Sequence, residues 1–243
     1  MNFLIIDGNS IINRAFYGIK LLTAKDGHFT NAIFGFMNIF MNLVEMTEPE
    51  CVAVAFDVHA PTFRHKMYDG YKAGRKGMPS ELHEQMEPLK EILRAYGCHT
   101  VECSGFEADD ILGTLALHCP EDSHCYIASG DRDSLQLVSE KVSVLLTTTK
   151  AGKTQTVEYT PKVLFDEYGL TASQMIELKA LQGDNSDNIP GVPGIGPKTA
   201  GELIKKYGNI DSIFQDIDSL QTTVGVKNKL KDGKESAYLS KTL

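Results

Sequence analysis

The chain has 243 residues, of which 42% are hydrophobic and 23% charged, so it is long and apolar enough to bury a core in water. No apolar run approaches the length needed to span a membrane. The start of the chain, with residues 3–6 apolar and Asp7 directly after them, is too short and insufficiently basic for a signal peptide. These features exclude a membrane-spanning protein, and we expect a cytoplasmic one.

The charges are unbalanced, with 32 acidic residues against 24 basic ones and a net charge of −8. On its face this argues against a nucleic-acid partner, because phosphates attract basic surfaces. The five cysteines are odd in number and show no CxxC spacing, which favours reduced thiols over a zinc site or a disulfide framework.

Three short apolar runs each end in an aspartate, at residues 3–7, 51–57 and 124–131. Helical patterns lie between them, at residues 32–46, 80–96 and 108–118. This alternation predicts a parallel α/β sheet. Ligands of such sheets bind beyond the carboxyl ends of the strands, so we expect Asp7, Asp57 and Asp131 to share one edge. The alternative is that each aspartate caps the helix or turn that follows it.

Two further groups of acids stand out. Residues 105–110, Gly-Phe-Glu-Ala-Asp-Asp, place Glu107, Asp109 and Asp110 together at the start of a predicted helix. Acids this close repel one another, so they either hold a cation or are solvated by water. Asp184 and Asp187 have the spacing i, i+3 and face the same way if their turn is helical. Capping or an Asx turn explains that spacing equally well.

A basic segment interrupts this acidic chain. Residues 62–78 contain one acid, Asp69, and five basic residues: Arg64, Lys66, Lys72, Arg75 and Lys76. Aromatic residues lie among them, a combination that suits phosphate contact and base stacking. Three glycines favour a mobile loop, and a solvated surface loop is the alternative.

The second half of the chain predicts a β-hairpin and a glycine-rich turn. Residues 142–148 and 154–159 alternate like paired strands, joined by a polar tip at 150–153. An amphipathic helix at 171–181 precedes residues 189–200, Ile-Pro-Gly-Val-Pro-Gly-Ile-Gly-Pro-Lys-Thr-Ala, which favour a tight hairpin before a helix ending near Tyr207. A helix start with free N–H groups binds phosphate without reading a base. The spacing is not GxGxxG and no GK[ST] follows, so a mononucleotide site is disfavoured. Beyond Asn209 the pattern fades.

Taken in order, the motifs are Ile-Ile-Asp7-Gly-Asn, Ala-Phe-Asp57, Phe63-Arg64, Tyr71-Lys-Ala-Gly-Arg75, Glu107-Ala-Asp-Asp110, Ser-Gly-Asp131-Arg-Asp133 and Gly-Asp184-Asn-Ser-Asp187-Asn-Ile-Pro-Gly-Val-Pro-Gly-Ile-Gly196. Over roughly residues 1–210 they closely resemble the 5′-nuclease (5′–3′ exonuclease and flap endonuclease) domain of bacterial DNA polymerase I. Single-domain phage and bacterial 5′ nucleases share the pattern.

The resemblance implies an α/β fold with two domains. Residues 1–170 would form a PIN-like core, a mostly parallel sheet flanked by helices, with a basic helical arch at residues 62–80. Residues 171–243 would form a helix-hairpin-helix DNA-binding region that ends earlier than the usual domain.

The resemblance also implies two Mg²⁺ or Mn²⁺ ions held by carboxylates and water. One metal group would be Asp7, Asp57, Glu107 and Asp109, with Asp110 nearby, and the other Asp131, Asp133, Asp184 and Asp187. The expected catalytic residues are Lys72, Arg75, Asp109 and Asp131. The expected DNA contacts, with a K⁺ ion at the hairpin, are Arg64, Tyr71, Lys72, Arg75, Lys179, Gly191, Val192, Gly194, Ile195, Gly196, Lys198 and Thr199.

The implied function is structure-specific hydrolysis of phosphodiesters at DNA or RNA-primer 5′ ends and flaps, in replication and repair. We expect a monomer at the bacterial nucleoid, with a polymerase domain in the full-length chain. If nine of the 32 acids hold metal, 23 remain against 24 bases, and the rest of the surface is close to +1. The alternatives are a stand-alone nuclease, a non-catalytic DNA-binding module, a PIN-type ribonuclease, which should lack the glycine hairpin, and a nucleotide-binding α/β protein.

Overall fold

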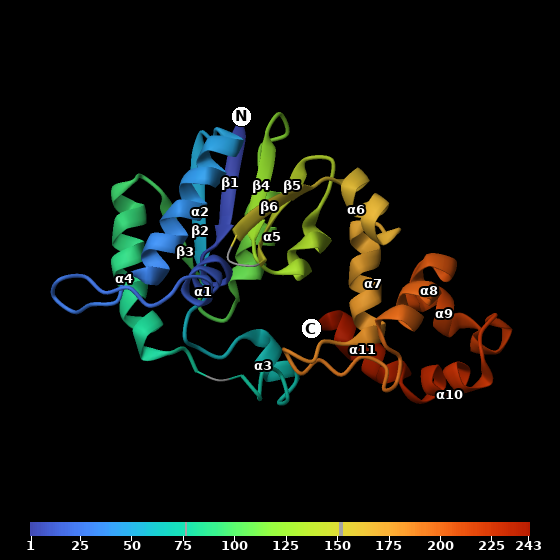
Figure 1. Ribbon diagram of the computed structural model, residues 1–243. Coiled ribbons are helices and arrows are strands. Elements are labelled where there is room, and N and C mark those ends of the chain that lie inside the picture. Colours follow the sequence, from blue (N-terminus) through green and yellow to red (C-terminus); the bar gives the residue numbers. More distant parts are fainter. Residues whose placement is uncertain (76, 151–152) are drawn as a thin grey trace. The chain divides into compact units, whose positions relative to one another are not determined.

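The computed structural model describes residues 1–75, 77–150 and 153–243 (Figure 1). Two compact units share these residues, Met1–Thr62 with Gly77–Val163, and Phe63–Lys76 with Leu164–Leu243. The basic segment, expected within the core domain, thus groups largely with the C-terminal unit. Lys76 of that segment, and residues 151 and 152 of the hairpin tip, lie outside the described residues.

The first unit is built on one six-stranded sheet with the order β3-β2-β1-β4-β5-β6. The strands are β1 (Asn2–Asp7), β2 (Cys51–Phe56), β3 (His99–Glu102), β4 (His124–Ser129), β5 (Val142–Lys150) and β6 (Lys153–Tyr159). All neighbouring pairs are parallel except β5 and β6, which form the expected antiparallel hairpin. The predicted mostly parallel α/β sheet is therefore confirmed, and β3 is a strand that the sequence pattern did not reveal.

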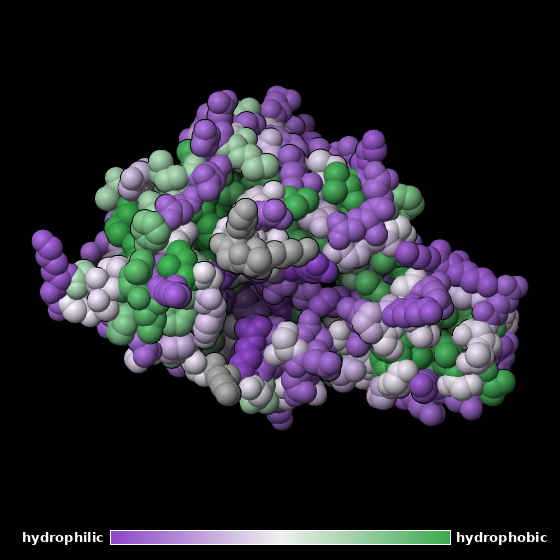
Figure 2. Space-filling view, in the orientation of Figure 1, coloured by the Kyte–Doolittle hydropathy of each residue, from purple (hydrophilic) through white to green (hydrophobic). Residues whose placement is uncertain are grey.

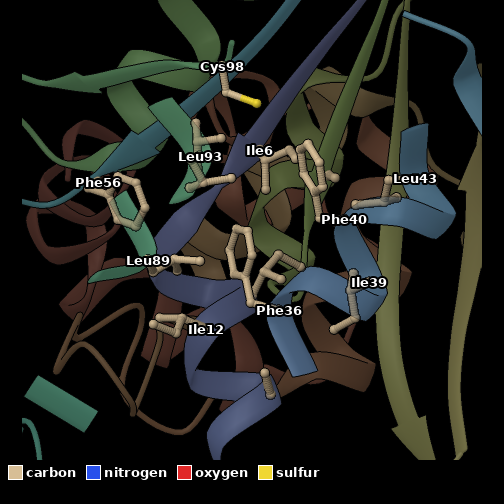
Figure 3. Packing of buried hydrophobic residues seen from close by; sticks show 14 of the residues in the cluster. Ile6, Ile12, Phe36, Ile39, Phe40, Leu43, Phe56, Leu89, Leu93 and Cys98 are labelled. Atoms are coloured by element: carbon tan, nitrogen blue, oxygen red, sulfur yellow. The ribbon is translucent and has the colours of Figure 1, made fainter. Parts of the chain in front are cut away.

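The helices of this unit are α1 (Gly8–Gly18), α2 (Asn31–Thr47), α4 (Ser80–Ala95), α5 (Ala108–Leu117) and the 3₁₀ helix η1 (Arg132–Leu137), and α6 (Pro161–Tyr168) spans the division between the units. Figure 3 shows how α1, α2 and α4 close over the sheet, with Ile12, Phe36 and Leu89 pointing into one cluster. The central strands are apolar without alternation because both of their faces are covered. This core fixes the strand ends that carry the acids.

The second unit is helical. It contains α3 (Phe63–Met67), α7 (Ala172–Gln182), α8 (Pro197–Tyr207), α9 (Ile210–Gln215), η2 (Ile217–Ser219), α10 (Val224–Asp232) and α11 (Lys234–Thr242). Helices α7 and α8 follow the predicted bounds closely, and α7 packs against both α8 and α11. The helices beyond residue 209 were missed because they are short. Their N-terminal caps could have been recognised, because Asn and Thr are preferred at that position. The side chains of Asn209 and Thr223 accept hydrogen bonds from the first turns of α9 and α10.

Some apolar side chains reach the surface of the first unit. Phe34, Met41 and Met46 of α2 are about half exposed. In Figure 2, apolar residues are visible at the surface in the region where Figure 1 labels α2 and α4. Exposed apolar residues of this kind are ordinary in folded proteins. Among the described residues, no helix combines the length and the apolar character that crossing a membrane requires.

Candidate active site

Three acids lie at the carboxyl ends of three neighbouring strands. Asp7 ends β1, Asp57 directly follows β2, and Asp131 lies two residues beyond β4. Strands β2 and β4 flank β1 in parallel register, so the three residues share one edge, as the alternation predicted. The strand order reverses between β1 and β4, which is where α/β sheets bind ligands. The metal-binding role of these acids stays a prediction.

Asp7 is the most buried of these acids, with 5% of its surface exposed. Its Oδ1 accepts a hydrogen bond from the Ser10 backbone N at 2.9 Å, and its Oδ2 accepts one from Ser129 Oγ at 2.8 Å. Burial, and to a lesser degree the charges of Asp57 and Asp131, raise the pKa of Asp7 to about 6 despite these bonds. The fold thus holds a carboxyl where its negative charge is unfavourable unless a cation compensates it.

Asp57 positions the start of α5. Its Oδ1 accepts a hydrogen bond from the Ala108 backbone N at 2.7 Å, and its own N donates to Asn9 Oδ1 at 3.1 Å. Glu107 and Asp110 form a capping box on the same helix, in which Asp110 Oδ2 accepts from the Glu107 N at 2.9 Å. This capping role by itself explains why an acidic residue stands at position 110, with no need for a metal ligand there.

Asp109 lies close enough to the other acids for their charges to act on its carboxyl. Burial raises the pKa of Asp109 well above its usual range, and the charges of Asp7, Asp131, Asp57 and Glu107 raise it further. Its side chain still reaches water, so solvent screens part of this repulsion. Five acids from β1, the ends of β2 and β4, and the start of α5 therefore lie within electrostatic range of one another.

The capping alternative holds for Asp7 and Asp131 but not for Asp57, which accepts from the start of α5 and not from the segment that follows it. Asp7 caps α1, and Asp131 Oδ1 accepts from the Asp133 N at 3.0 Å at the start of η1. Each cap uses one carboxylate oxygen and fixes the rotamer, which leaves the second oxygen of Asp131 for other partners. Among the described residues, no three His, Cys, Asp or Glu side chains form a ready-made metal site. The five carboxylates are an open cluster whose donors are the hard oxygens that Mg²⁺ and Mn²⁺ prefer.

A basic residue beside this cluster was missed by the sequence reasoning. Arg14 of α1 donates from Nη2 to the Gly130 carbonyl at 2.8 Å, and its charge interacts with Asp131. Its Nε is buried without a hydrogen-bond partner. Arg14 lines a cavity of about 450 Å³ together with Ser10, Asn13, Tyr17 and Gly18. The sequence does contain a pattern that could have located Arg14. The spacing of the apolar residues Ile11, Ile12 and Ala15 predicts a helix directly after Asp7, and in such a helix Arg14 lies one turn beyond Ser10.

The second acidic pair belongs to the second unit, where both acids are paired with cations. Asp184 Oδ2 lies 2.6 Å from Lys179 Nζ, and its Oδ1 accepts from the Ser186 N at 2.7 Å. These bonds outweigh burial and lower the pKa of Asp184 to about 2. Residues 184–186 thus form an Asx turn, the alternative explanation for the spacing of Asp184 and Asp187. Lys179, which was expected to contact DNA, forms an ion pair with Asp184.

Asp187 pairs with the basic segment. Its carboxylate bonds Arg75 Nη2 and lies 3.8 Å from Lys72 Nζ, while Tyr71 Oη lies 3.4 Å from Oδ2. Tyr71 is buried, with its ring against His65, so it is not presented for base stacking. Arg64 stacks over Phe63 and donates to the backbone oxygen of Leu243.

Some residues of the glycine-rich turn are buried and others are exposed. Val192 and Ile195 are buried, so their side chains anchor the turn and only their backbone could meet DNA. Gly194, Gly196 and Lys198 are exposed, and Thr199 is partly exposed. Pro197 begins α8, whose N-terminal N–H groups follow the turn. This is the exposed helix start that phosphate binding requires.

The raised pKa of Asp7 makes the stability of the metal-stripped protein depend on pH. An acid with a pKa of about 6 when folded and 3.8 when unfolded keeps its proton longer in the fold, so stability falls as the pH rises from about 4 through 6. We expect a lower melting temperature at pH 7.5 than at pH 5, and Asp7→Asn should reduce that difference, with the raised pKa of Asp109 accounting for what remains. An equal pH dependence in both proteins would contradict the assignment.

Comparison with known proteins matches both parts of the chain to one family. Residues 2–169 match the 5'-3' exonuclease N-terminal resolvase-like domain, and residues 170–243 match the 5'-3' exonuclease C-terminal SAM fold. DNA polymerase I of Bacillus caldotenax is 43% identical over 241 residues, which are 99% of this chain and 27% of that protein. The chain thus spans about a quarter of the length of this relative.

Two solved structures from bacteriophage T5 share the fold, each 25% identical with a TM-score of 0.77, and each covering 99% of this chain and 88% of the other. One is the T5 5'-exonuclease with divalent metal ions (zinc) bound, and the other is the D15 flap endonuclease in a pseudo-enzyme-product complex with DNA and metal ions. With both domain matches in sequence order, and with an acidic cluster at the strand ends, the chain belongs to the 5′–3′ exonuclease family.

Proposed function

We propose that the chain is a divalent-metal-dependent nuclease that hydrolyses phosphodiesters at the 5′ ends and flaps of branched DNA, including RNA-primer ends. The observation that carries this proposal is the group of five acids at the sheet edge, Asp7, Asp57, Glu107, Asp109 and Asp131. The pKa values of Asp7 and Asp109 are raised by burial and by the charges of neighbouring acids. Such a group favours divalent cations, since bound metal relieves the repulsion.

Two bound metal ions would ionise a water and stabilise the charge that builds up on the phosphate and the leaving oxygen. The residues that would hold one ion are Asp7, Asp57, Glu107 and Asp109, and those proposed for the other are Asp131, Asp133, Asp184 and Asp187. Ser10, Ser129, Asn9 and the α5 backbone orient the first group by the hydrogen bonds described above. We propose Mg²⁺ or Mn²⁺ for this site because its donors are all oxygens.

The rest of the chain would hold and orient the DNA. The exposed N–H groups and Lys198 at the start of α8 would grip the duplex backbone, with a K⁺ ion at the hairpin. Lys72 and Arg75 would meet the scissile phosphate. These groups contact phosphate and not base edges, so specificity would be for DNA shape.

The similarity to DNA polymerase I relatives, of which the chain spans 27%, favours a polymerase domain in the full-length protein. The T5 structure with DNA and metal ions favours a flap substrate. A protein of this kind would act on the bacterial chromosome in replication and repair, as a monomer, with residues 1–170 as the nuclease core and 171–243 as the DNA-binding region.

A cleavage assay with a 5′-flapped duplex tests the proposal. We expect cutting near the junction in Mg²⁺ or Mn²⁺, no cutting after the metal is removed with EDTA, and full recovery when the metal is added back. Saturating metal should also raise the melting temperature at pH 7.5, because it neutralises the clustered acids. DNA binding without cleavage in every metal would indicate a non-catalytic module. Cleavage that persists in EDTA would rule out the metal mechanism.

A further inference from the structure

Tyr71, Lys72, Arg75 and Asn188 attach the basic segment to the second acidic turn. Side chains of Arg75, Lys72 and Tyr71 converge on the Asp187 carboxylate. The backbones also pair, since the Lys72 N donates to the Asp187 carbonyl at 2.9 Å. Asn188 Nδ2 donates to the Gly70 carbonyl at 2.7 Å. All of these residues belong to one compact unit, so the attachment is a local property of that unit.

The attachment is well formed and costs the backbone some strain. Lys72 and Asn188 have φ of +55° and +56°, a region that residues other than glycine seldom occupy. The side chains of Lys72 and Asp187 are only 17% and 18% exposed, which shields their interaction from water. Lys72 Nζ also lies 5.0 Å from the centre of the Tyr71 ring, whose hydroxyl points to the same carboxylate. Interactions from several directions therefore hold this strained conformation in place.

Basic side chains of the same unit more than offset the two acids of this turn. Asp184 and Asp187 carry two negative charges, and the cations bonded to them are Lys179, Lys72 and Arg75. The two acids proposed to hold metal are thus paired with cations that include the two proposed to meet the scissile phosphate. A divalent cation bound to Asp187 would withdraw negative charge from this carboxylate and repel the two nearby cations, so it would weaken their hold on Asp187.

We infer that Asp187 is a positioning residue that alternates between two partners. Without metal it holds Lys72 and Arg75, and with Asn188 it fixes residues 70–75 against the acidic turn. When a divalent cation occupies Asp184 and Asp187, Lys72 and Arg75 are released toward substrate phosphate. The second half of this inference rests on the proposed function, because it takes Asp184 and Asp187 as metal ligands.

Limited digestion with trypsin tests the attachment, because Lys72 is only 17% exposed beside Asp187 and should be cut more readily once this segment detaches. Cleavage after Lys25, in the exposed loop between α1 and α2, serves as the reference within each molecule. Without metal we expect Asp187→Asn to raise the ratio of cleavage at Lys72 and Arg75 to cleavage at Lys25 by about fivefold. Wild type in saturating Mg²⁺ should show a similar rise, and Asp187→Asn should not respond to Mg²⁺.

Three variants control the experiment. Asp218→Asn removes another Asp–Lys pair of the same unit, Asp218 with Lys231 at 2.6 Å, and should leave the ratio unchanged. Asp184→Asn keeps the attachment but removes a proposed metal ligand, so Mg²⁺ should no longer raise the ratio. Asn188→Gly tolerates the positive φ and removes only the amide bonded to Gly70, so it should raise the ratio even if Asp187→Asn folds poorly.

An unchanged ratio in both Asp187→Asn and Asn188→Gly would overturn the attachment. A ratio that stays constant or falls when Mg²⁺ is added to wild type would overturn the exchange of partners. Failure of the proposed function looks different: flap DNA would stay uncut in Mg²⁺ while Asp187→Asn still exposed the segment to trypsin. Normal flap cutting with no effect of any variant on digestion would remove this inference alone.

Discussion

Replacing Asp109 by asparagine is expected to lower the rate of flap cleavage by at least about 10³-fold, because it removes a charge that the site needs for metal. The fold should survive. Burial and four neighbouring acids raise the pKa of Asp109, so a neutral amide of the same shape relieves repulsion and should leave the melting temperature of the metal-free protein equal or higher.

Asp131→Asn should reduce cleavage to a similar degree by the same reasoning. Its Oδ1 accepts the Asp133 N, and an asparagine oxygen can keep that bond, so η1 should stay capped. The matched control is Asp122→Asn, an exposed acid on the loop before β4 in the same unit, which should cleave like wild type. The measurement is single-turnover cutting of a 5′-flap in Mg²⁺, with DNA affinity measured in parallel.

Affinity for DNA should change little in both variants, because the proposed grip on the duplex lies at the glycine-rich turn and not at the sheet edge. If both variants cut at the wild-type rate, the proposed metal site is wrong. If both lose DNA binding together with cleavage, the acids act on the fold or on binding and not on the chemistry.

The acids at the sheet edge could be predicted because each follows a pattern that lies within a few consecutive residues. Each strand that carries Asp7, Asp57 or Asp131 is a continuous apolar run, and strand–helix alternation dictates a parallel sheet whose carboxyl ends meet. Burial on both faces leaves no other arrangement for such runs. The same reasoning placed Glu107 and Asp109 at a helix start, where the structure puts them beside Asp57.

The partners of these acids could not be predicted in the same way. Arg75 and Asp187 are 112 residues apart, and nothing in either motif says that they form an ion pair. Lys179 and Asp184 are only five residues apart, yet their pairing depends on how the chain turns after α7 at Gly183, which has a φ of +71°. Ion pairs of this kind depend on how distant parts of the chain pack together. The sequence therefore shows which charged residues are present, but it does not show which of them pair with one another.

Gly191→Ala is expected to be the most destabilising of the glycine-to-alanine substitutions in the glycine-rich turn. Gly191 has a φ of +58°, where an alanine is strained by about 1 kcal/mol. An added Cβ would also lie 2.6 Å from the Gln182 carbonyl carbon and 2.7 Å from the Gly183 Cα, both of them backbone atoms that cannot turn aside. Overpacking of this kind costs about 1–3 kcal/mol more, so we expect a total loss of about 2–4 kcal/mol.

The position matters for DNA binding because Gly191 ties the turn to the rest of its unit. Its N donates to Ser240 Oγ at 2.9 Å, and its carbonyl accepts from Ser236 Oγ at 2.6 Å, both on α11. The next residue continues the attachment, since the Val192 N donates to the Leu181 carbonyl of α7 at 2.7 Å. Displacing Gly191 should therefore shift the exposed N–H groups before α8 and weaken binding to duplex DNA by about tenfold or more.

Gly196→Ala is the matched control for this prediction. Gly196 lies in the same turn with an ordinary φ of −89°, and a Cβ there meets nothing within 4 Å, so its stability should change by less than about 1 kcal/mol. Urea denaturation of both variants, with DNA affinity measured by fluorescence anisotropy, separates the two positions. Equal stability of the two variants would mean that the approach of Gly191 to Gly183 is looser than the structure shows. A destabilised Gly191→Ala protein that still binds duplex at wild-type affinity would place the DNA grip outside this turn.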